Sequence, residues 1–358
     1  MNRPTKPLAA GPPTISSVAA LAGVSIATVS RCLNHSARVQ PDTRARVQDA
    51  VKQLGYSPNG LAQSFRRGRT NIVMVVMPHA GCPFLGDVLA GVREGIAGRY
   101  SIVIAEANLA EGSYEQVGAM LVSRQVDGLV LLATRPPFGT GLEDLARARH
   151  LPIVIGCESV SDELAALPSV QIDNFAAAHE ATRHLIDLGH RRIAFVGGPL
   201  DKLVTRDRER GYRAAMAESG LSVPEAYVQA VPLSTVGGAT AAARLLEAGP
   251  RPSATFCGND EMALGAMDAY RRAGLRIPED MSVMGFDDIR YAAIASPPLS
   301  TVAQPAHAIG RRVAARIIEE IEGGAPSGPA GDVLPYRLMI RQSTGPCQPP
   351  RSATGDTP

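Results

Sequence analysis

The spacing of apolar residues separates the first 70 residues from the rest of the chain. In this first part apolar side chains recur at helical spacing, which predicts three short helices that begin at Ser16 or Ser17, at Ser25 and at Pro41. Gly55 is placed to end the third helix. The predicted core of this small unit consists of apolar residues on the inner helix faces: Val18, Ala22, Val24, Val29, Leu33, Val47, Ala50, Val51 and Leu54.

After residue 70 the pattern changes to short, continuous apolar runs that alternate with helical stretches. Runs rich in Val and Ile are typical of strands in a parallel sheet that helices cover on both faces. The alternation continues beyond residue 280, which is longer than one domain usually is, and therefore predicts two α/β lobes. The predicted strands are 72–77, 102–105, 129–133, 153–156, 193–197, 254–257 and 282–286.

Charge is distributed unevenly along the 358 residues, although the formal net charge is only +2. Residues 1–70 hold ten Lys or Arg residues against two acids, Asp42 and Asp49, a balance of +8. The other 26 basic and 32 acidic residues give −6 for the remainder. This basic segment could be a solvated tail. Its Val, Ala and Leu residues lie at helical spacing, however, which favours a folded domain that binds phosphate groups.

Motifs of common catalytic and metal sites are missing from the sequence. It contains no G-x-x-x-x-G-K-[ST] phosphate loop, no G-x-S-x-G nucleophile elbow and no H-E-x-x-H zinc motif. The five cysteines are far apart and odd in number, which disfavours a disulfide framework. With no recognisable signal peptide and no membrane-length apolar stretch, a cytoplasmic protein without catalytic residues, cofactor or metal is expected. The alternative is an enzyme or a transport-type binding protein that uses the α/β body.

Residues 14–34, TISSVAALAGVSIATVSRCLN, match a helix-turn-helix, whose second helix enters the major groove of DNA. Together with later segments they resemble the lactose-repressor/galactose-repressor (LacI/GalR) family. The similar segments are TRARV (43–47), LGYSPN (54–59), VDGLVLLA (126–133), QIDN (171–174), GHRRIAFVGGP (189–199), NDEMALGAM (259–267), GLRIPEDMSVMGFDDI (274–289) and PPLSTVAQP (297–305). ATRPPF (133–138) and AQPAHAIGR (303–311) are most similar to the family's cytidine-responsive ribonucleoside repressors.

The resemblance implies a fold, a function and an order of domains. The fold is a small all-α helix-turn-helix domain followed by a periplasmic-binding-protein-like α/β sensor of two doubly wound parallel-sheet lobes. The function is that of a sequence-specific transcriptional regulator, expected to be a repressor homodimer that binds pseudo-palindromic operator DNA and a small effector, a nucleoside or sugar, away from membranes. The expected limits are a disordered start (1–13), the helix-turn-helix (14–58), a hinge helix (59–70), lobe 1 (71–170 and 301–330), lobe 2 (171–300 and 331–345) and a disordered tail (346–358).

Carried over by position, the family's groove-reading residues fall on Ile26, Ala27 and Arg31. Arg31 can make a bidentate contact with guanine, worth roughly 1–3 kcal/mol of discrimination. From spacing alone Ile26 is ambiguous, because it shares a helical face with Val29 and Leu33 and could equally pack in the core. Phosphate or further DNA contacts are implied for Ser25, Thr28, Ser30, Asn34 and Arg38.

The connector at 59–70 resembles the family's hinge helix, which enters the minor groove. Phe65 stands where most members have a Leu that wedges between base pairs, and Phe is also used as a wedge. The alternative is that Phe65 packs against the sensing domain. Asn59 and Ala62 match further DNA-facing positions, and nearby arginines supply positive charge: Arg66, Arg67 and Arg69.

The family's effector positions fall on six residues of the α/β body: Phe84, Lys202, Arg208, Leu233, Asn259 and Asp287. The resemblance implies that Asp287 accepts two vicinal hydroxyls, that Arg208 holds an oxygen and that Phe84 forms a stacking wall. Without it, Arg208 could bridge a neighbouring acid, Asp207 or Glu209, on a helix surface, and Asp287 could cap the turn after its strand. Where many members have an acidic contact this chain has Cys157 followed by Glu158, which leaves the effector's identity open.

Overall fold

The structure is a computed structural model that describes residues 13–34, 39–56, 69–78, 80–106, 120, 125–132, 151–157, 167–200, 202–323 and 331–348. The chain divides after Thr70 into a smaller and a larger unit, residues 1–70 and 71–358. The predicted disordered start lies outside the described residues except for Pro13. The predicted tail begins too early, because the Cys347 amide still donates to the Leu188 carbonyl at 2.8 Å.

The smaller unit has the three predicted helices: α1 (Ile15–Ala22), α2 (Ile26–Asn34) and α3 (Pro41–Leu54). The sequence predicts that α1 begins at Ser16 or Ser17, but its N-cap is Thr14. The Thr14 hydroxyl accepts the Ser17 amide at 3.2 Å while the Ser17 hydroxyl accepts the Thr14 amide at 3.4 Å, which is a reciprocal capping box. For α2 the predicted cap is confirmed, since the Ser25 hydroxyl accepts the Thr28 amide at 3.1 Å.

The core of the smaller unit is a single layer of small side chains. Val18, Val29 and Val47 are completely buried where the three helices meet, and Cys32, which was not predicted, joins them. Ala22 and Ala50 are buried as expected, whereas the remaining predicted residues are only partly buried around this layer: Val24, Leu33, Val51 and Leu54. So thin a core limits the stability of the unit on its own.

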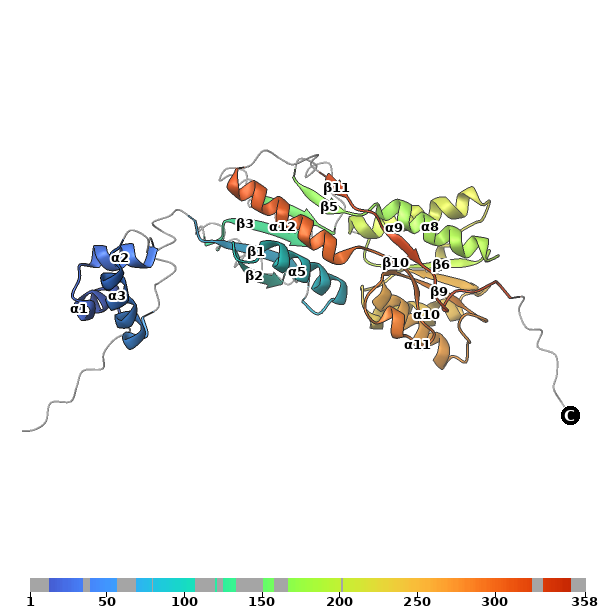
Figure 1. Ribbon diagram of the computed structural model, residues 1–358. Coiled ribbons are helices and arrows are strands. Elements are labelled where there is room, and N and C mark those ends of the chain that lie inside the picture. Colours follow the sequence, from blue (N-terminus) through green and yellow to red (C-terminus); the bar gives the residue numbers. More distant parts are fainter. Residues whose placement is uncertain are drawn as a thin grey trace, which may run out of the picture. The chain divides into compact units, whose positions relative to one another are not determined.

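The larger unit contains two six-stranded sheets, which confirms the predicted two-lobed α/β class (Figure 1). The first sheet is parallel throughout, in the order β11-β5-β4-β3-β1-β2. Its strands are β1 (Ile72–Met77), β2 (Ser101–Glu106), β3 (Gly128–Leu132), β4 (Ile153–Gly156), β5 (Ser169–Gln171) and β11 (Gly331–Val333).

The second sheet has the order β12-β10-β9-β8-β6-β7, in which only β12 is antiparallel to its neighbour. Its strands are β6 (Ile193–Gly197), β7 (Val228–Ala230), β8 (Ala254–Cys257), β9 (Ser282–Asp287), β10 (Ser300–Ala303) and β12 (Arg337–Met339). All seven predicted strands are present. The five that the apolar pattern missed, β5, β7 and β10 to β12, are three or four residues long.

Helices pack in pairs on these sheets (Figure 1). On the first sheet α5 (Pro83–Ile96) packs against α12 (Ala306–Glu322). On the second, α8 (Asn174–Asp187) and α9 (Leu203–Glu218) cover one face, and α10 (Thr235–Glu247) and α11 (Asp260–Arg272) the other. The pairs are close because glycines lie at the contacts: a Cβ on Gly91 would lie 2.2 Å from the His307 carbonyl oxygen, and one on Gly238 2.0 Å from that of Met262.

The chain passes between the two sheets three times: after β5, after β10 and after β11. The predicted lobe limits therefore need correction. Residues 301–303 belong to the second lobe, since β10 pairs with β9, and residues 331–333 belong to the first, since β11 pairs with β5. Such limits depend on strand pairing, which the apolar pattern does not contain. Short 3-10 helices at η3 (Glu225–Tyr227) and η4 (Ala292–Ile294) complete the second lobe.

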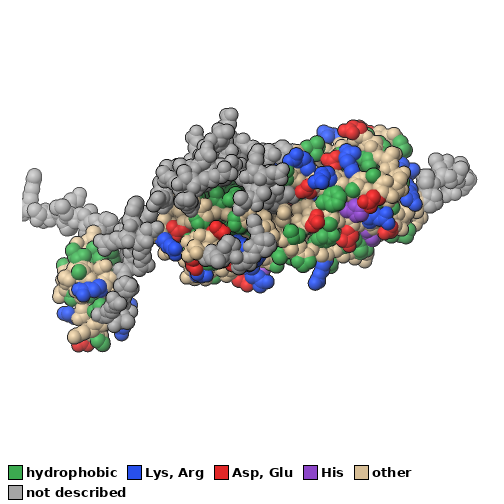
Figure 2. All heavy atoms as spheres, turned by 90° about the horizontal axis from the view of Figure 1, so that it is seen from above, with side chains coloured by type: hydrophobic (Ala, Val, Ile, Leu, Met, Phe, Trp, Pro, Cys, Tyr) green, Lys and Arg blue, Asp and Glu red, His purple; other side chains and the backbone are tan. Residues whose placement is uncertain are grey.

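On the face of the larger unit drawn in Figure 2, basic and acidic side chains are interspersed. The larger unit has ion pairs such as Arg213–Glu209, at 2.7 Å, and Arg276–Asp280, at 2.9 Å. Within the described ranges, no helix is by itself long and apolar enough to cross a membrane, although the bent pair α1 and α2 passes that test by length and composition. No cluster of three or more His, Cys, Asp or Glu residues there could hold a metal ion.

Candidate functional site

Six of the residues that the sequence assigned to DNA have described side chains, and these lie on α2 or directly before it. Ser25, Ala27 and Arg31 are exposed, Thr28 and Ser30 are half-buried, and the side chain of Ile26 is 50% exposed. The alternative that Ile26 packs in the core is therefore wrong. The Arg31 side chain lies along its own helix, with Nε donating to the Ala27 carbonyl at 3.3 Å.

The rest of the predicted DNA contacts cannot be placed. Arg38, Asn59, Ala62 and Phe65 lie outside the described residues, as does the side chain of Asn34. These assignments, and the alternative packing of Phe65, stay predictions.

In the larger unit, residues of both lobes line a cavity of about 400 Å³. This volume is within the range of sites for small molecules. The structure brings all six predicted effector residues together around it: Phe84, Lys202, Arg208, Leu233, Asn259 and Asp287. They come from five different segments of the chain, so the cavity exists only because the two lobes are assembled.

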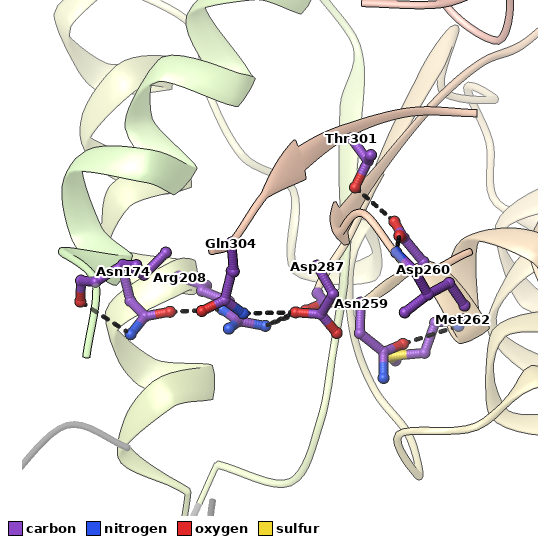
Figure 3. Close-up of polar contacts among 11 residues, drawn as sticks. Asn174, Arg208, Asn259, Asp260, Met262, Asp287, Thr301 and Gln304 are labelled. Carbon is purple, nitrogen blue, oxygen red and sulfur yellow. Dashed lines mark hydrogen bonds and ion pairs between the residues drawn. The ribbon is translucent and has the colours of Figure 1, made fainter. Parts of the chain in front are cut away.

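Arg208, on α9, is held in place by contacts with several other segments (Figure 3). Its Nε donates to Asn174 Oδ1 at 3.0 Å and its Nη1 donates to the Gly258 carbonyl at 2.5 Å. Its guanidinium carbon lies 3.6 Å from the centroid of the Phe286 ring, an arrangement in which cation and ring attract each other. With a residue exposure of only 8%, the Arg208 side chain is fixed in direction.

The alternative that Arg208 bridges a neighbouring acid on the helix surface is wrong. Asp207 pairs with Arg210 at 3.0 Å and Glu209 pairs with Arg213 at 2.7 Å. Arg208 lies beside Asp287 instead, whose Oδ1 is 3.8 Å from Arg208 Nη1.

Asp287, the last residue of β9, combines a buried carboxylate with an unusual backbone. Its Oδ1 accepts Gln304 Nε2 at 2.7 Å and faces Arg208 (Figure 3). Both partners are side chains of other segments, which argues against a mere cap of its own turn. Burial raises the pKa of Asp287 to about 6, although Arg208 and the Gln304 amide act in the opposite direction. Its φ of 114° and that of Asp288, 56°, lie in the region that favours glycine.

Asn259 is oriented by its own helix. Its Oδ1 accepts the Met262 amide at 2.8 Å and so caps α11. With the oxygen engaged, the amide Nδ2 is the group that Asn259 offers as a hydrogen-bond donor at the cavity.

The two walls of the cavity differ in chemistry. Among the described residues, the first lobe contributes only uncharged side chains: Pro78, Cys82, Phe84, Leu85 and Cys157. Burial raises the pKa of the Cys82 thiol to about 12, so it stays neutral. The second lobe contributes the ionisable and amide groups: Lys202, Arg208, Asn259, Glu261 and Asp287. Within the described part of the chain, the charged and amide groups of the cavity therefore all lie on the second lobe, which also contributes apolar side chains such as Val204 and Leu233.

Sequence reasoning missed the residues that hold these groups. Asn174 binds Arg208, Gln304 binds Asp287, and Asp260 accepts both the Thr301 hydroxyl at 2.6 Å and the Ile289 amide at 2.8 Å. A signal did exist for Gln304, because it follows an apolar stretch and polar residues at the carboxyl ends of parallel strands converge. No comparable pattern singled out Asp260.

Fold and cavity together define a class: a helix-turn-helix unit joined to a two-lobed α/β body of the kind that binds small ligands. Residues 14–59 match the family described as "Bacterial regulatory proteins, lacI family", and residues 182–344 match the "Periplasmic binding protein-like domain". The HTH-type transcriptional repressor CytR of Escherichia coli (strain K12) is 33% identical over 332 residues, which cover 92% of this chain and 96% of the relative.

Solved structures agree with this result. The lac repressor dimer bound to operator and the anti-inducer ONPF has a TM-score of 0.81 at 27% identity and covers 94% of this chain and all of that chain. The complex of the transcriptional regulator CelR with cellobiose has a TM-score of 0.71 at 34% identity, over 92% of this chain and 99% of that one. The chain belongs to the lacI family of DNA-binding transcriptional regulators, which are not enzymes.

Proposed function

We propose that this chain is a repressor whose affinity for a pseudo-palindromic operator is set by a nucleoside bound in the 400 Å³ cavity. The observation that carries the proposal is the buried pair of Arg208 and Asp287, which is fixed at one wall of a cavity between two lobes. A buried carboxylate of this kind selects for a ligand that can donate hydrogen bonds to it, because an unsatisfied buried acceptor is costly.

The difference between the two walls supports a nucleoside over a sugar. A ribose would face the second lobe, where Asp287 accepts its vicinal hydroxyls and Arg208 and Asn259 donate to its oxygens. The planar base would lie against the first lobe, where described lining residues such as Phe84 and Leu85 offer an apolar surface. A disaccharide carries hydroxyls on both sides and would leave some of them unpaired against that wall. The second candidate is nevertheless a sugar, because a relative is solved with cellobiose.

On the DNA side, we assign direct base reading to Arg31 together with Ile26 and Ala27. All three are exposed on α2, so no core contact competes with the groove. Arg31 can address a guanine edge, whereas Ile26 and Ala27 can offer only apolar contacts, for example to a thymine methyl. Phosphate contacts are assigned to Ser25, Thr28, Ser30, Asn34 and Arg38, and minor-groove contacts to Asn59, Ala62 and Phe65.

Coupling between the two sites follows from the three crossings between the lobes. A ligand that binds both walls changes the relative free energies of lobe arrangements, and a regulator needs such differential binding. We propose that this bias acts on the connector at 59–70 within a homodimer that works in the cytoplasm, where its operator is. The dimeric lac repressor on its operator is the precedent in a related chain.

A thermal-shift panel on the full chain tests the proposal. Cytidine, uridine, adenosine, ribose and cellobiose are added at millimolar concentration, with Asp287→Asn as the matched variant. A bound ligand raises Tm by mass action, so at least one nucleoside is expected to raise that of the natural chain and not that of the variant. Stabilisation by cellobiose alone would favour the second candidate. Stabilisation by none of the five would show that the cavity does not bind this class of ligand.

A further inference from the structure

Asp260 is the most deeply buried acid near the cavity, yet it does not line it. Its residue exposure is 0%, and it directly follows Asn259 as the first residue of α11. An acid in the first turn of a helix often serves the helix dipole or its cap. Here the cap is supplied by Asn259, and the Asp260 oxygens accept from two other segments of the chain.

Those two bonds join the end of β9 to β10 through α11 (Figure 3). Oδ2 accepts the amide of Ile289, two residues after Asp287, at 2.8 Å, and Oδ1 accepts the Thr301 hydroxyl of β10 at 2.6 Å. The carboxylate reaches Thr301 because Gly285 has no side chain: a Cβ there would lie 2.2 Å from Asp260 Oδ1. Thr301 and Gly285 are register partners on the two strands.

The segment to which Asp260 is hydrogen-bonded contains two residues with an unfavourable backbone conformation. Asp287 and Asp288 both have positive φ, a conformation that non-glycine residues keep only where surrounding contacts impose it. Side-chain contacts that help to do so are Gln304 to Asp287, Arg341 to Asp288 at 2.8 Å, and Asp260 to the Ile289 amide. Of these, only the Asp260 contact fixes the backbone itself, directly after the two strained residues.

We propose that Asp260 is a positioning residue, which holds the Asp287–Asp288 turn so that the Asp287 carboxylate faces the cavity. The inference rests on the proposed function, since it takes Asp287 as the acceptor of the ligand's vicinal hydroxyls. Asp260 touches no ligand itself. Its loss should therefore weaken only the part of ligand binding that passes through Asp287.

A pair of probes isolates that part: cytidine, which has the vicinal hydroxyls, and 2′,3′-dideoxycytidine, which lacks both. Affinities are measured by calorimetry on the full chain and its Asp260→Ala and Asp260→Asn variants. For Asp260→Ala we expect cytidine to bind at least about tenfold more weakly and dideoxycytidine to change less than about twofold. Asp260→Asn should restore cytidine binding to within about threefold, because its oxygen can accept the Ile289 amide and its NH₂ can donate to the Thr301 hydroxyl.

Controls separate positioning from stability. Asp268→Asn, on the exposed side of the same helix, removes a carboxylate paired with Arg272 and should change neither affinity by more than about twofold. Should Asp260→Ala fail to fold, Thr301→Val removes one of the two bonds and is expected to lower cytidine affinity two- to fivefold, an order-of-magnitude figure, and not that of the dideoxy compound.

The outcomes decide between distinct claims. Equal losses for both probes, or no loss for either, in Asp260→Ala or Thr301→Val would overturn the positioning role. Failure of the natural chain to bind cytidine and every other ligand of the thermal-shift panel would overturn the proposed function, and the inference with it.

Discussion

In helix α2 the side chains assigned to base reading are exposed, whereas Arg208 and Asp287 of the cavity are buried and hydrogen-bonded to residues around them. Ile26 is 50% exposed, while Arg208 and Asp287 are 8% and 9% exposed. Exposed groups cost the fold little and become ordered on DNA. Buried groups are ordered in advance, but a buried charge lowers the stability of the fold that carries it. Substitutions of the exposed residues in the smaller unit should therefore change DNA affinity without changing stability. In the larger unit, a substitution that removes a buried charge should lower ligand affinity without lowering the stability of the fold.

The largest effect is expected from Asp287→Asn. Loss of the charged acceptor should lower the affinity for the effector by about 100-fold or more, since two charge-assisted hydrogen bonds are affected. Stability should not fall with it. Burial raises the pKa of Asp287 to about 6, so the ionised carboxylate is unfavourable in the folded chain at neutral pH. Calorimetry and a thermal melt at pH 7.5 check both expectations. A large drop in Tm would contradict the claim that the buried charge serves binding at a cost in stability.

Arg31→Ala tests the smaller unit in the same way. We expect specific operator affinity to fall about 10- to 100-fold, non-specific affinity to change far less, and Tm to stay the same. Titration of an operator selected from random palindromes, and of a scrambled duplex, measures the difference at fixed salt. Arg276→Ala, in an exposed ion pair of the larger unit, is the matched control. Equal losses on both duplexes would mean that Arg31 contacts only phosphate.

Low pH should lower the affinity for the effector, because it protonates the Asp287 carboxylate. Because the carboxylate must be ionised to accept two hydroxyls, affinity is expected to be about tenfold lower at pH 5 than at pH 7.5. The same group acts on unliganded stability with the opposite sign: its pKa is raised by folding, so the penalty present above about pH 6 is relieved as pH falls toward the ordinary value of 3.8. Affinity that is flat between these two pH values would show that Asp287 does not bind as a carboxylate.

The smallest effects come from a pair of apolar substitutions in α2. Ile26→Ala should leave the melt unchanged and alter base preference at one operator position by about 1 kcal/mol or less. Val29→Ala, three residues away and fully buried, should instead destabilise the unit by about 1–2 kcal/mol. A melt of each variant checks this contrast. A loss of stability in Ile26→Ala would instead indicate that Ile26 packs in the core.

Local patterns predicted the elements of this fold well and its long-range contacts poorly. The runs that became β1 and β6 needed only their own Val and Ile residues to be found. By contrast β5 and β11 pair although about 160 residues of chain separate them, and each is only three residues long. No local pattern contains such a pairing, which is why the limits of the lobes were misplaced.

The cavity shows the same division. Its lining residues were named from family resemblance, and the structure does bring them together. Their supports were not named: Asn174, Asp260 and Gln304 lie 34, 41 and 17 residues from the partners Arg208, Thr301 and Asp287. A single polar residue at such a separation leaves no periodic signal, because its role depends on where the strands end in space.

The central claim is that occupancy of the cavity changes the affinity for DNA. The direct measurement is the operator affinity of the full chain by fluorescence anisotropy at fixed salt, with and without a saturating ligand from the thermal-shift panel. The account predicts a change of about 5- to 150-fold, the usual size of such coupling, which disappears in Asp287→Asn. An operator affinity that stays the same, while the ligand is shown to be bound, would contradict it.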